Sequence, residues 1–254
     1  MLFKFRLADA KLLKDVFAGI ATLIDEATFN LDITGMKLRA MDPSRVAMVD
    51  FEWPASLFEE YTCAEPVKLC VSMTGLLKLL KRASKDEAVE MSQDQKGDKL
   101  KITIISKKGT SVRAFSLHTL DASEEESPAP KLTYNVNAKL TTDGISQMID
   151  DAQLVSDHIR ITADPEKLVM TAQGDLMTAE ITVQKGSDVL LNLEAKTPSK
   201  ATFGLSHLAD VIHTAAATAD MVTLEYSSDM PMKLDFQQKQ GKLLYYLAPR
   251  IESD

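Results

Sequence analysis

Two helical segments that match in outline decide the fold of this chain: LLKLLKRA at residues 76–83 and LADVIHTA at residues 208–215. In the first segment, four apolar residues follow the i, i+3, i+4, i+7 spacing that places side chains on one side of an α-helix. They are Leu76, Leu79, Leu80 and Ala83. The second segment lies 132 residues further on, about half of the 254-residue chain. A repeat of that length is typical of a duplicated domain and not of a solenoid.

The elements around these helices repeat in the same order. Each half predicts a strand, a helix, three strands separated by turns, a further strand, the second helix and closing strands. In the first half we expect helices over residues 9–24, with Asp9 as N-cap, and over residues 74–84. Between the halves, DASEEESPAPK at residues 121–131 has three consecutive glutamates and two prolines, and predicts an exposed, extended linker. The expected domains are therefore residues 1–120 and 132–254.

Composition excludes several classes of protein. The formal net charge is -8, which argues against general attraction to nucleic acid, although it leaves room for local basic patches. No apolar stretch approaches the roughly 20 residues of a membrane span, and the N-terminus lacks a signal-peptide pattern. We therefore expect a cytoplasmic protein that does not enter a membrane. Cys63 and Cys70 are the only cysteines and are predicted to be buried, reduced thiols.

The helix over residues 74–84 has a basic side opposite its apolar side. Four cations follow the helical spacing two residues after the leucines: Lys78, Lys81, Arg82 and Lys85. A cationic face without acidic partners suffers like-charge repulsion and favours an anionic ligand, a merely solvated face being the alternative. The first helix adds Lys11 and Lys14, diluted by Asp15. The second-half helices are less basic and present His207 and His213, with Lys139 as the nearest lysine.

No catalytic or metal-binding motif is recognisable. His207 and His213 are six residues apart, so they do not form a helical i, i+4 metal pair. Asp150 and Asp151 diverge by about 100° on a helix, which makes them poor candidates for a carboxylate dyad. There is no phosphate-binding loop and no nucleophile elbow. We therefore expect neither an enzyme nor a cofactor or metal site.

Four segments resemble the sliding clamps of the proliferating cell nuclear antigen type, especially the archaeal members. They are LRAMDPSRVAMVDF at 38–51, DAQLVSDHIRI at 151–161, DMPMKLDF at 229–236 and YYLAPRIE at 245–252. The resemblance runs from end to end and includes the duplication and the central linker. On these motifs the chain is identified as a member of that family.

The resemblance implies an α+β DNA-clamp fold: two similar domains, each with two helices packed on antiparallel sheets. Three chains would form a six-domain ring that encircles duplex DNA without reading its sequence, and acts as a processivity factor for replication and repair. The implied partners are DNA polymerase, clamp loader, flap endonuclease and DNA ligase. The residues expected to face DNA are Lys11, Lys14, Lys78, Lys81, Arg82, Lys85, Lys139, His207 and His213.

The family's partners insert aromatic and aliphatic anchors into a pocket beneath the linker. Carried over by motif, that pocket comprises Met41, Arg45, Val46, Pro130, Asp229, Pro231, Tyr246, Ala248 and Pro249. Simple core packing is the alternative role of Met41 and Val46. The linker departs from the family pattern, because Ser127 and Ala129 stand where a large aliphatic residue is usual.

Ring contacts in the family pair an edge strand of one domain with an edge strand of the next subunit. The matching segments are residues 110–118 and 175–183, with Thr110, Arg113, Phe115, Leu117, Leu176, Thr178, Glu180 and Thr182 at the interface. A homotrimer is the simplest ring, and a subunit of a heterotrimer that needs paralogues is the alternative. Rival functions are a basic amphipathic membrane-surface protein and a metal-dependent nuclease; the apolar helix face, needed to cover a sheet, argues against the first.

Overall fold

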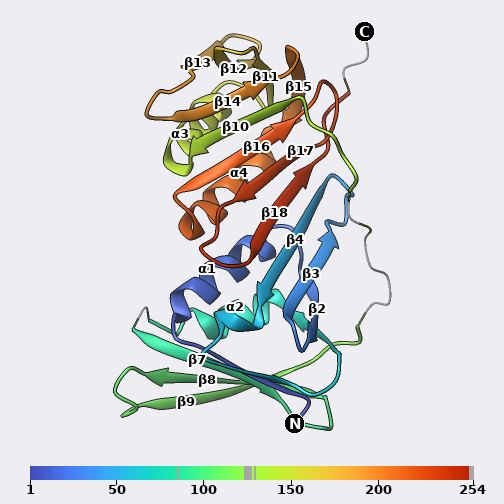
Figure 1. Cartoon of the computed structure of the whole chain (residues 1–254), viewed down its shortest axis with the longest axis vertical. Coiled ribbons are helices and arrows are strands. Elements are labelled where there is room, and N and C mark those ends of the chain that lie inside the picture. The colour runs from blue at the N-terminus through green and yellow to red at the C-terminus, as the bar shows by residue number, and fades with distance from the viewer. Residues whose placement is uncertain (85, 123–127, 129, 252–254) are drawn as a thin grey trace. The chain divides into compact units, whose positions relative to one another are not determined.

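The computed structural model describes residues 1–84, 86–122, 128 and 130–251. The chain divides into two compact units. Unit 1 comprises Met1–Pro43, Val49–Ser127 and Lys239–Leu243, and unit 2 comprises Ser44–Met48, Pro128–Gln238 and Leu244–Asp254. Both units have two α-helices and antiparallel sheets, so the predicted α+β fold with two similar domains is confirmed (Figure 1).

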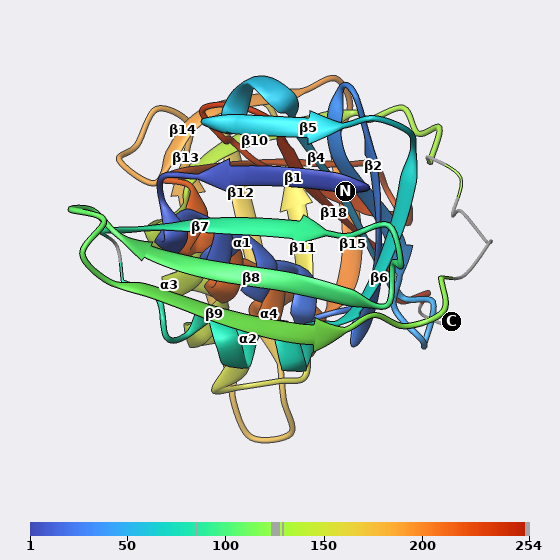
Figure 2. The same ribbon diagram turned by 90° about the horizontal axis from the view of Figure 1, so that it is seen from below.

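Unit 1 contains two antiparallel arrays of strands. Its elements are β1 (Phe3–Leu7), α1 (Ala10–Ala21), β2 (Glu26–Asp32), β3 (Gly35–Met41), β4 (Ala47–Pro54), a 3-10 turn (Ala55–Leu57), β5 (Glu60–Cys63), β6 (Val67–Ser72), α2 (Met73–Leu80), β7 (Glu87–Gln93), β8 (Lys99–Ser106) and β9 (Val112–His118). One array has the order β5-β1-β7-β8-β9, and the other runs β4-β3-β2-β6. Figure 2 shows the five-stranded array in front of α1 and α2.

Unit 2 repeats this plan. Its elements are β10 (Val136–Thr141), α3 (Thr142–Gln153), β11 (His158–Ala163), β12 (Lys167–Gln173), β13 (Thr178–Gln184), β14 (Leu190–Ala195), β15 (Ser199–Gly204), α4 (Leu205–Ala215), a 3-10 turn (Ala216–Thr218), β16 (Met221–Tyr226), β17 (Met232–Phe236) and most of β18 (Lys242–Leu247), whose first two residues belong to unit 1. A four-stranded sheet has the order β13-β12-β11-β15, and the remaining strands run β14-β10-β16-β17-β18.

The core of unit 1 forms where α1 packs its apolar side on the sheets. Phe17 of α1 stacks on Phe29 of β2 with ring centroids 5.0 Å apart, and Phe51 and Trp53 of β4 complete the aromatic cluster. All four side chains are almost wholly buried. Burial of each such side chain stabilises the fold by about 1.5–3 kcal/mol. The helix begins where predicted, because the Asp9 carboxylate accepts the Leu12 N–H at 3.0 Å.

The second helix is shorter than predicted: α2 ends at Leu80, not at residue 84. Beyond it the backbone tightens, because the N–H groups of Arg82 and Ala83 donate to carbonyls three residues back. Ser84 then gives its N–H to the Glu87 carboxylate at 2.8 Å, which replaces the helical hydrogen bond. Helical periodicity therefore continues past the end of the helix itself.

Three strands were not predicted: β5, β14 and β18. β5 and β14 are edge strands of their arrays, and neither EYTC of β5 nor LLNLEA of β14 alternates regularly between apolar and polar residues. They are ordered by pairing with β1 and β10, which lie far away in the chain. Cys63 and Cys70 are buried and free, as expected. Among the described residues, no helix is long and apolar enough to cross a membrane.

Candidate DNA-facing and partner-binding surfaces

The exposed cations of α2 lie at its C-terminal end. Lys78 lies in the last turn, and Lys81 and Arg82 follow it, all three exposed, whereas Leu76 and Leu80 are buried. Positive charge at a helix C-terminus interacts favourably with the helix dipole, by about 0.3–1 kcal/mol for each residue. The cluster therefore stabilises α2 and at the same time presents a basic surface, which we call the α2 basic surface (Lys78, Lys81 and Arg82). Lys85 lies outside the described residues.

The turn that carries Arg82 is anchored to the sheet. The Arg113 guanidinium on β9 donates to the Arg82 carbonyl at 2.9 Å and to the Glu87 carboxylate at 2.6 Å. The hydrogen bond from the Ser84 N–H and that from Arg113 lower the pKa of Glu87 below its usual value. Arg113, predicted for the subunit interface, thus has partners within its own unit.

The basic residues of α1 are partly neutralised. Lys11 forms an i, i+4 ion pair with Asp15 at 2.5 Å, and Lys14 lies 3.8 Å from the other oxygen of the same carboxylate. Hydrogen bonding and attraction to Asp15 raise the pKa of Lys11. The α1 surface therefore has about one net positive charge, and the α2 basic surface dominates unit 1.

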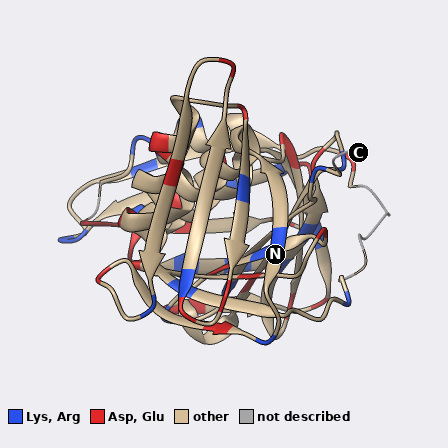
Figure 3. Ribbon diagram, turned by 90° about the horizontal axis from the view of Figure 1, so that it is seen from above, with Lys and Arg blue, Asp and Glu red and all other residues tan. Residues whose placement is uncertain are grey.

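The helices of unit 2 are acidic. Neither α3 nor α4 contains a lysine or arginine, and their exposed residues include Asp143, Asp150, Asp151 and Asp210. His213 of α4 lies 2.9 Å from the Asp150 carboxylate of α3, and His207 is half-buried. Figure 3 marks the charged residues along the ribbon. The positive charge predicted from sequence is thus concentrated in unit 1.

Lys139 lies away from the helices of its unit. It belongs to β10, where its neighbours Ala138 and Leu140 are completely buried in the core next to α3. Since successive side chains of a strand point to opposite faces, Lys139 lies on the other face of the sheet. This placement separates it from any surface formed by α3 and α4.

Most of the predicted partner pocket falls within unit 2, and the structure joins two of its segments. The Ala248 N–H donates to the Val46 carbonyl at 2.8 Å, so these residues lie side by side. Arg45 and Asp229 have φ values of 59° and 53°, a left-handed conformation that is uncommon outside glycine and is concentrated at functional sites. Val46 is 37% exposed, too open for a residue that only fills the core.

The other predicted pocket residues are mostly half-buried, and they are divided between the two units. Tyr246 lies on β18 opposite Lys233, while Pro130, Pro231, Ala248 and Pro249 are half-buried. Met41 is 40% exposed at the end of β3 in unit 1. Ser127 and Ala129 lie outside the described residues. Arg45, Val46 and the segment from Tyr246 to Pro249 thus share one unit, and Met41 belongs to the other.

Both segments predicted for subunit contacts are outermost strands. β9 ends the five-stranded array, and β13 ends the four-stranded sheet. Phe115 and Leu117 are half-buried, whereas Thr178, Glu180 and Thr182 are exposed; Thr110 and Leu176 lie just before the strands. Leu176 is 95% exposed, and Val112 and Met177 are also strongly exposed. An open edge with apolar residues beside it is a surface that soluble proteins usually cover.

Comparison with known proteins identifies this combination of surfaces. Residues 2–126 match the model of the proliferating cell nuclear antigen N-terminal domain, and residues 129–251 match that of its C-terminal domain. This chain belongs to the proliferating cell nuclear antigen family. It is a sliding clamp, and members of the family are non-enzymatic processivity factors, so the predicted sliding-clamp function and the non-enzymatic role are confirmed.

Individual relatives of this clamp cover its whole length. It is 34% identical over 254 residues to a DNA polymerase sliding clamp of Cenarchaeum symbiosum, with both chains fully covered. It is 35% identical to one of Thermococcus gammatolerans, over 99% of this chain and 100% of the relative. The crystal structure of PCNA from Thermococcus kodakaraensis matches with a TM-score of 0.91 at 28% identity, covering 98% and 100% of the two chains.

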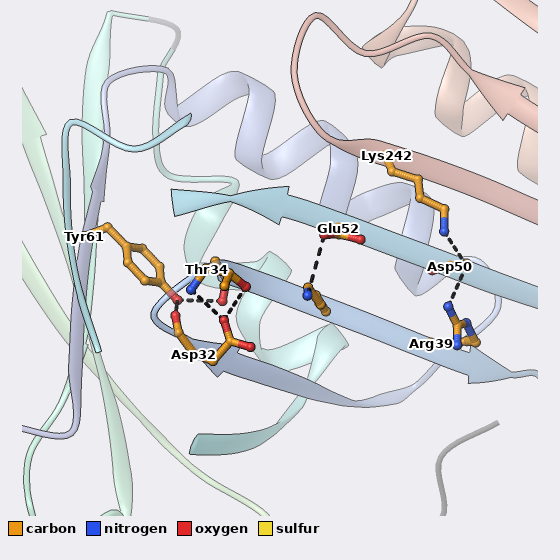
Figure 4. Close-up of polar contacts among 9 residues, drawn as sticks. Asp32, Thr34, Arg39, Asp50, Glu52, Tyr61 and Lys242 are labelled. Carbon is orange, nitrogen blue, oxygen red and sulfur yellow. Dashed lines mark hydrogen bonds and ion pairs between the residues drawn. The ribbon is translucent and has the colours of Figure 1, made fainter. Parts of the chain in front are cut away.

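A buried carboxylate of the clamp joins three strand segments within unit 1. Asp50 of β4 accepts hydrogen bonds from Lys242 of β18 at 2.7 Å and from Arg39 of β3 at 3.0 Å (Figure 4). Asp50 is 4% exposed, so its charge depends on these two partners. β3 leads to Met41, and β18 leads to Tyr246 and Ala248.

The β2–β3 turn is held by a second polar group. Asp32 accepts the Thr34 hydroxyl and N–H, which lowers the pKa of its carboxyl group. The Tyr61 hydroxyl donates to the backbone carbonyls of Asp32 and Gly35 at 2.8 and 2.7 Å, and burial raises the pKa of this phenol (Figure 4). Gly35 is required here, since a Cβ atom would lie 2.1 Å from the Trp53 carbonyl oxygen.

Sequence reasoning missed two features of the clamp surface. Tyr134 is half-buried with an unsatisfied hydroxyl, and burial, with Tyr246 and Glu225 nearby, raises its pKa. A group of cations on β11, β15 and the C-terminal segment was also missed: Arg160, Lys200 and Arg250. The alternation along β11 and along β15 could have placed Arg160 and Lys200 on the outward face of their own strands. That these strands are neighbours depends on the strand order of the sheet, which the alternation does not give.

Proposed function

We propose that this chain closes a ring with two further copies of itself, and that duplex DNA passes through the ring. The two open sheet edges, β9 and β13, carry this proposal, because each belongs to a different unit and each has exposed apolar residues beside it. Head-to-tail pairing of two different edges forms a closed ring when the rotation from one subunit to the next adds up to a full turn. A closed ring of this kind leaves neither edge strand unpaired.

The α2 basic surface is the main DNA-facing surface in this proposal, with Lys11 and Lys14 beside it. Lys and Arg attract phosphates without reading bases, which suits a ring that must move along any sequence. His207 and His213 contribute positive charge only when protonated, and four exposed aspartates lie on the same two helices. Lys139 is left out of this surface because it lies on the opposite face of its sheet.

The second part of the proposal is recruitment of DNA polymerase, clamp loader, flap endonuclease and DNA ligase. The relatives named DNA polymerase sliding clamp support the first of these partners. The proposed docking site is the predicted pocket around Val46, Ala248 and Pro249, whose first two residues adjoin. The proposed domain boundaries remain residues 1–120 and 132–254, with residues 121–131 as connecting linker.

A subunit of a heterotrimeric ring is the second candidate. It is favoured by the acidic helices of unit 2, which leave a homotrimer with one basic helical surface per chain. In a mixed ring, paralogous chains would supply the missing cations. The native mass of the purified chain decides between the two candidates. A homotrimer of the 28.0 kDa chain has a mass of about 84 kDa, whereas a subunit that needs paralogues stays smaller.

The ring itself is tested by its topology on DNA. After loading by a clamp loader, a closed ring is retained on circular duplex DNA and slides off the same DNA once it is linearised. Equal retention on circular and linear DNA would contradict the proposal. Blocking both ends of the linear DNA with bound protein should restore retention.

A further inference from the structure

The outward face of the four-stranded sheet in unit 2 carries three cations that the functions above do not use. On β11, Ile159 and Ile161 are completely buried, and α3 packs against this strand. Alternation therefore places Arg160 on the face away from α3. The strand register puts Arg160 between Thr171 of β12 and Thr202 of β15, and Lys200 lies two residues before Thr202 on the same face.

The C-terminal segment brings the third cation to the same place. The Arg250 N–H donates to the Thr202 carbonyl at 2.7 Å, so the segment after β18 lies against β15. The Arg250 guanidinium contacts Nε2 of His158. This contact places the Arg250 side chain beside β11, which carries Arg160.

These residues surround two adjoining hollows with volumes of about 260 and 310 Å³. Arg160, Thr202 and Arg250 line both, and Lys200 lines the second. Asp229 is the one acidic residue among the described residues of either lining. Three cations against one carboxylate leave a positive site, and its two guanidinium groups present paired donors that match the two oxygens of a carboxylate.

We propose that this basic hollow binds a carboxylate of a partner protein, from an acidic residue next to the anchors that enter the partner pocket. The inference rests on the proposed recruitment function. Continuity supports it, since Ala248 and Pro249 of the pocket directly precede Arg250, and Asp229 belongs to both sites. A DNA phosphate is the less favoured ligand, because the hollow lies on the sheet face opposite α3.

Peptide binding to the full chain tests this proposal. Three fluorescent peptides share the same aliphatic and aromatic anchors and carry two glutamates before the anchors, two glutamates after them, or glutamines at both places. The protein variants are Arg160→Gln with Arg250→Gln, and a control with the same charge change, Lys185→Gln with Lys196→Gln, at exposed lysines outside both hollows. Fluorescence anisotropy at low salt gives each dissociation constant.

The wild-type chain should bind one glutamate peptide about twofold to fivefold more tightly than the glutamine peptide, a range typical of exposed charge pairs. The preference should vanish in the arginine double variant and persist in the lysine control. Millimolar inorganic phosphate at constant ionic strength should reduce it. The glutamine peptide should bind all three proteins equally.

Two results overturn the inference: a glutamate preference that persists in the arginine variant, or no preference in a wild-type chain that binds the glutamine peptide. A wild-type chain that binds none of the peptides refutes the proposed recruitment and this inference with it, so the two failures are distinguishable. A short DNA duplex that displaces the glutamate peptide from the wild type, but leaves the glutamine peptide bound, assigns the hollow to phosphate and overturns the carboxylate proposal.

Discussion

Neutralising the α2 basic surface should weaken DNA binding and reduce the dependence of that binding on salt concentration. The variant replaces Lys78, Lys81 and Arg82 with glutamine, which keeps long side chains of good helix propensity. In the described part of unit 1, these three cations and about one net charge from α1 make up the basic helical surface. The substitutions thus remove, in each chain, about three of the four net positive charges of this helical surface.

The magnitude follows from counterion release. Each neutralised phosphate of duplex DNA contributes about -0.9 to the slope of log K against log salt concentration. Loss of three contacts on one chain reduces the slope by about 3, and loss of all such contacts in a trimer by about 8. Loss of favourable charge at the helix end also destabilises α2, by about 1–2 kcal/mol in total. The fold should survive this change.

The assay is fluorescence anisotropy with a short labelled duplex, without loader, at four or more salt concentrations. A control variant replaces Lys101, Lys185 and Lys196 with glutamine, exposed lysines that lie outside the helices. It makes the same change in net charge. A slope that is unchanged in the α2 variant, or reduced equally in the control, would refute the assignment of this surface to DNA. Native mass measurement verifies that both variants keep the oligomeric state of the wild type.

Four further predictions concern stability, assembly and recruitment. Asp50→Asn removes the negative charge that Arg39 and Lys242 share. Breaking a fully buried ion pair costs about 3–5 kcal/mol, and because both cations are partly exposed we expect about 1–3 kcal/mol here, a fall in Tm of roughly 3–10 °C. Calorimetry measures this fall, and an unchanged Tm would contradict the prediction. The pKa of Glu87 lies below the usual 4.5, so its contribution to stability is fully present above pH 4.5 and is lost as the pH falls through the lower folded pKa; the Tm difference between wild type and Glu87→Gln should therefore be seen at pH 7 and shrink as the pH is lowered below 4.5. Leu176→Glu places a charge at a fully exposed position beside β13, so it should lower the native mass to that of a monomer without lowering the Tm of the subunit; a mass that stays at the wild-type value removes this segment from the interface. Val46→Glu should weaken binding of an anchor peptide at least about tenfold, as expected for an apolar pocket residue, with native mass unchanged, whereas equal binding would place the pocket elsewhere.

Helix faces and strand alternation could be predicted from sequence because they depend on neighbours within about eight residues, and the duplication because the same order of segments occurs twice in the chain. The apolar sides of α1 and α2 and the Asp9 cap are examples. The predicted end of α2 was wrong because the hydrogen bond from the Ser84 N–H to Glu87 replaces a helical hydrogen bond, and the apolar periodicity carries no information about that competition. β5 and β14 were missed because their order comes from pairing with distant strands.

The sequence by itself determined that this chain is a duplicated α+β clamp with a basic helical side in its first half. Those properties are local, or are written twice in the chain. Only the tertiary structure decided which charges remain available. It paired Lys11 with Asp15 and placed Lys139 on the far face of its sheet. It also joined Arg160, Lys200 and Arg250, from segments that lie 40 to 50 residues apart in the chain. The physical reason is that strand register and chain reversal bring distant residues together, and the spacing of residues along the chain does not show which of them become neighbours.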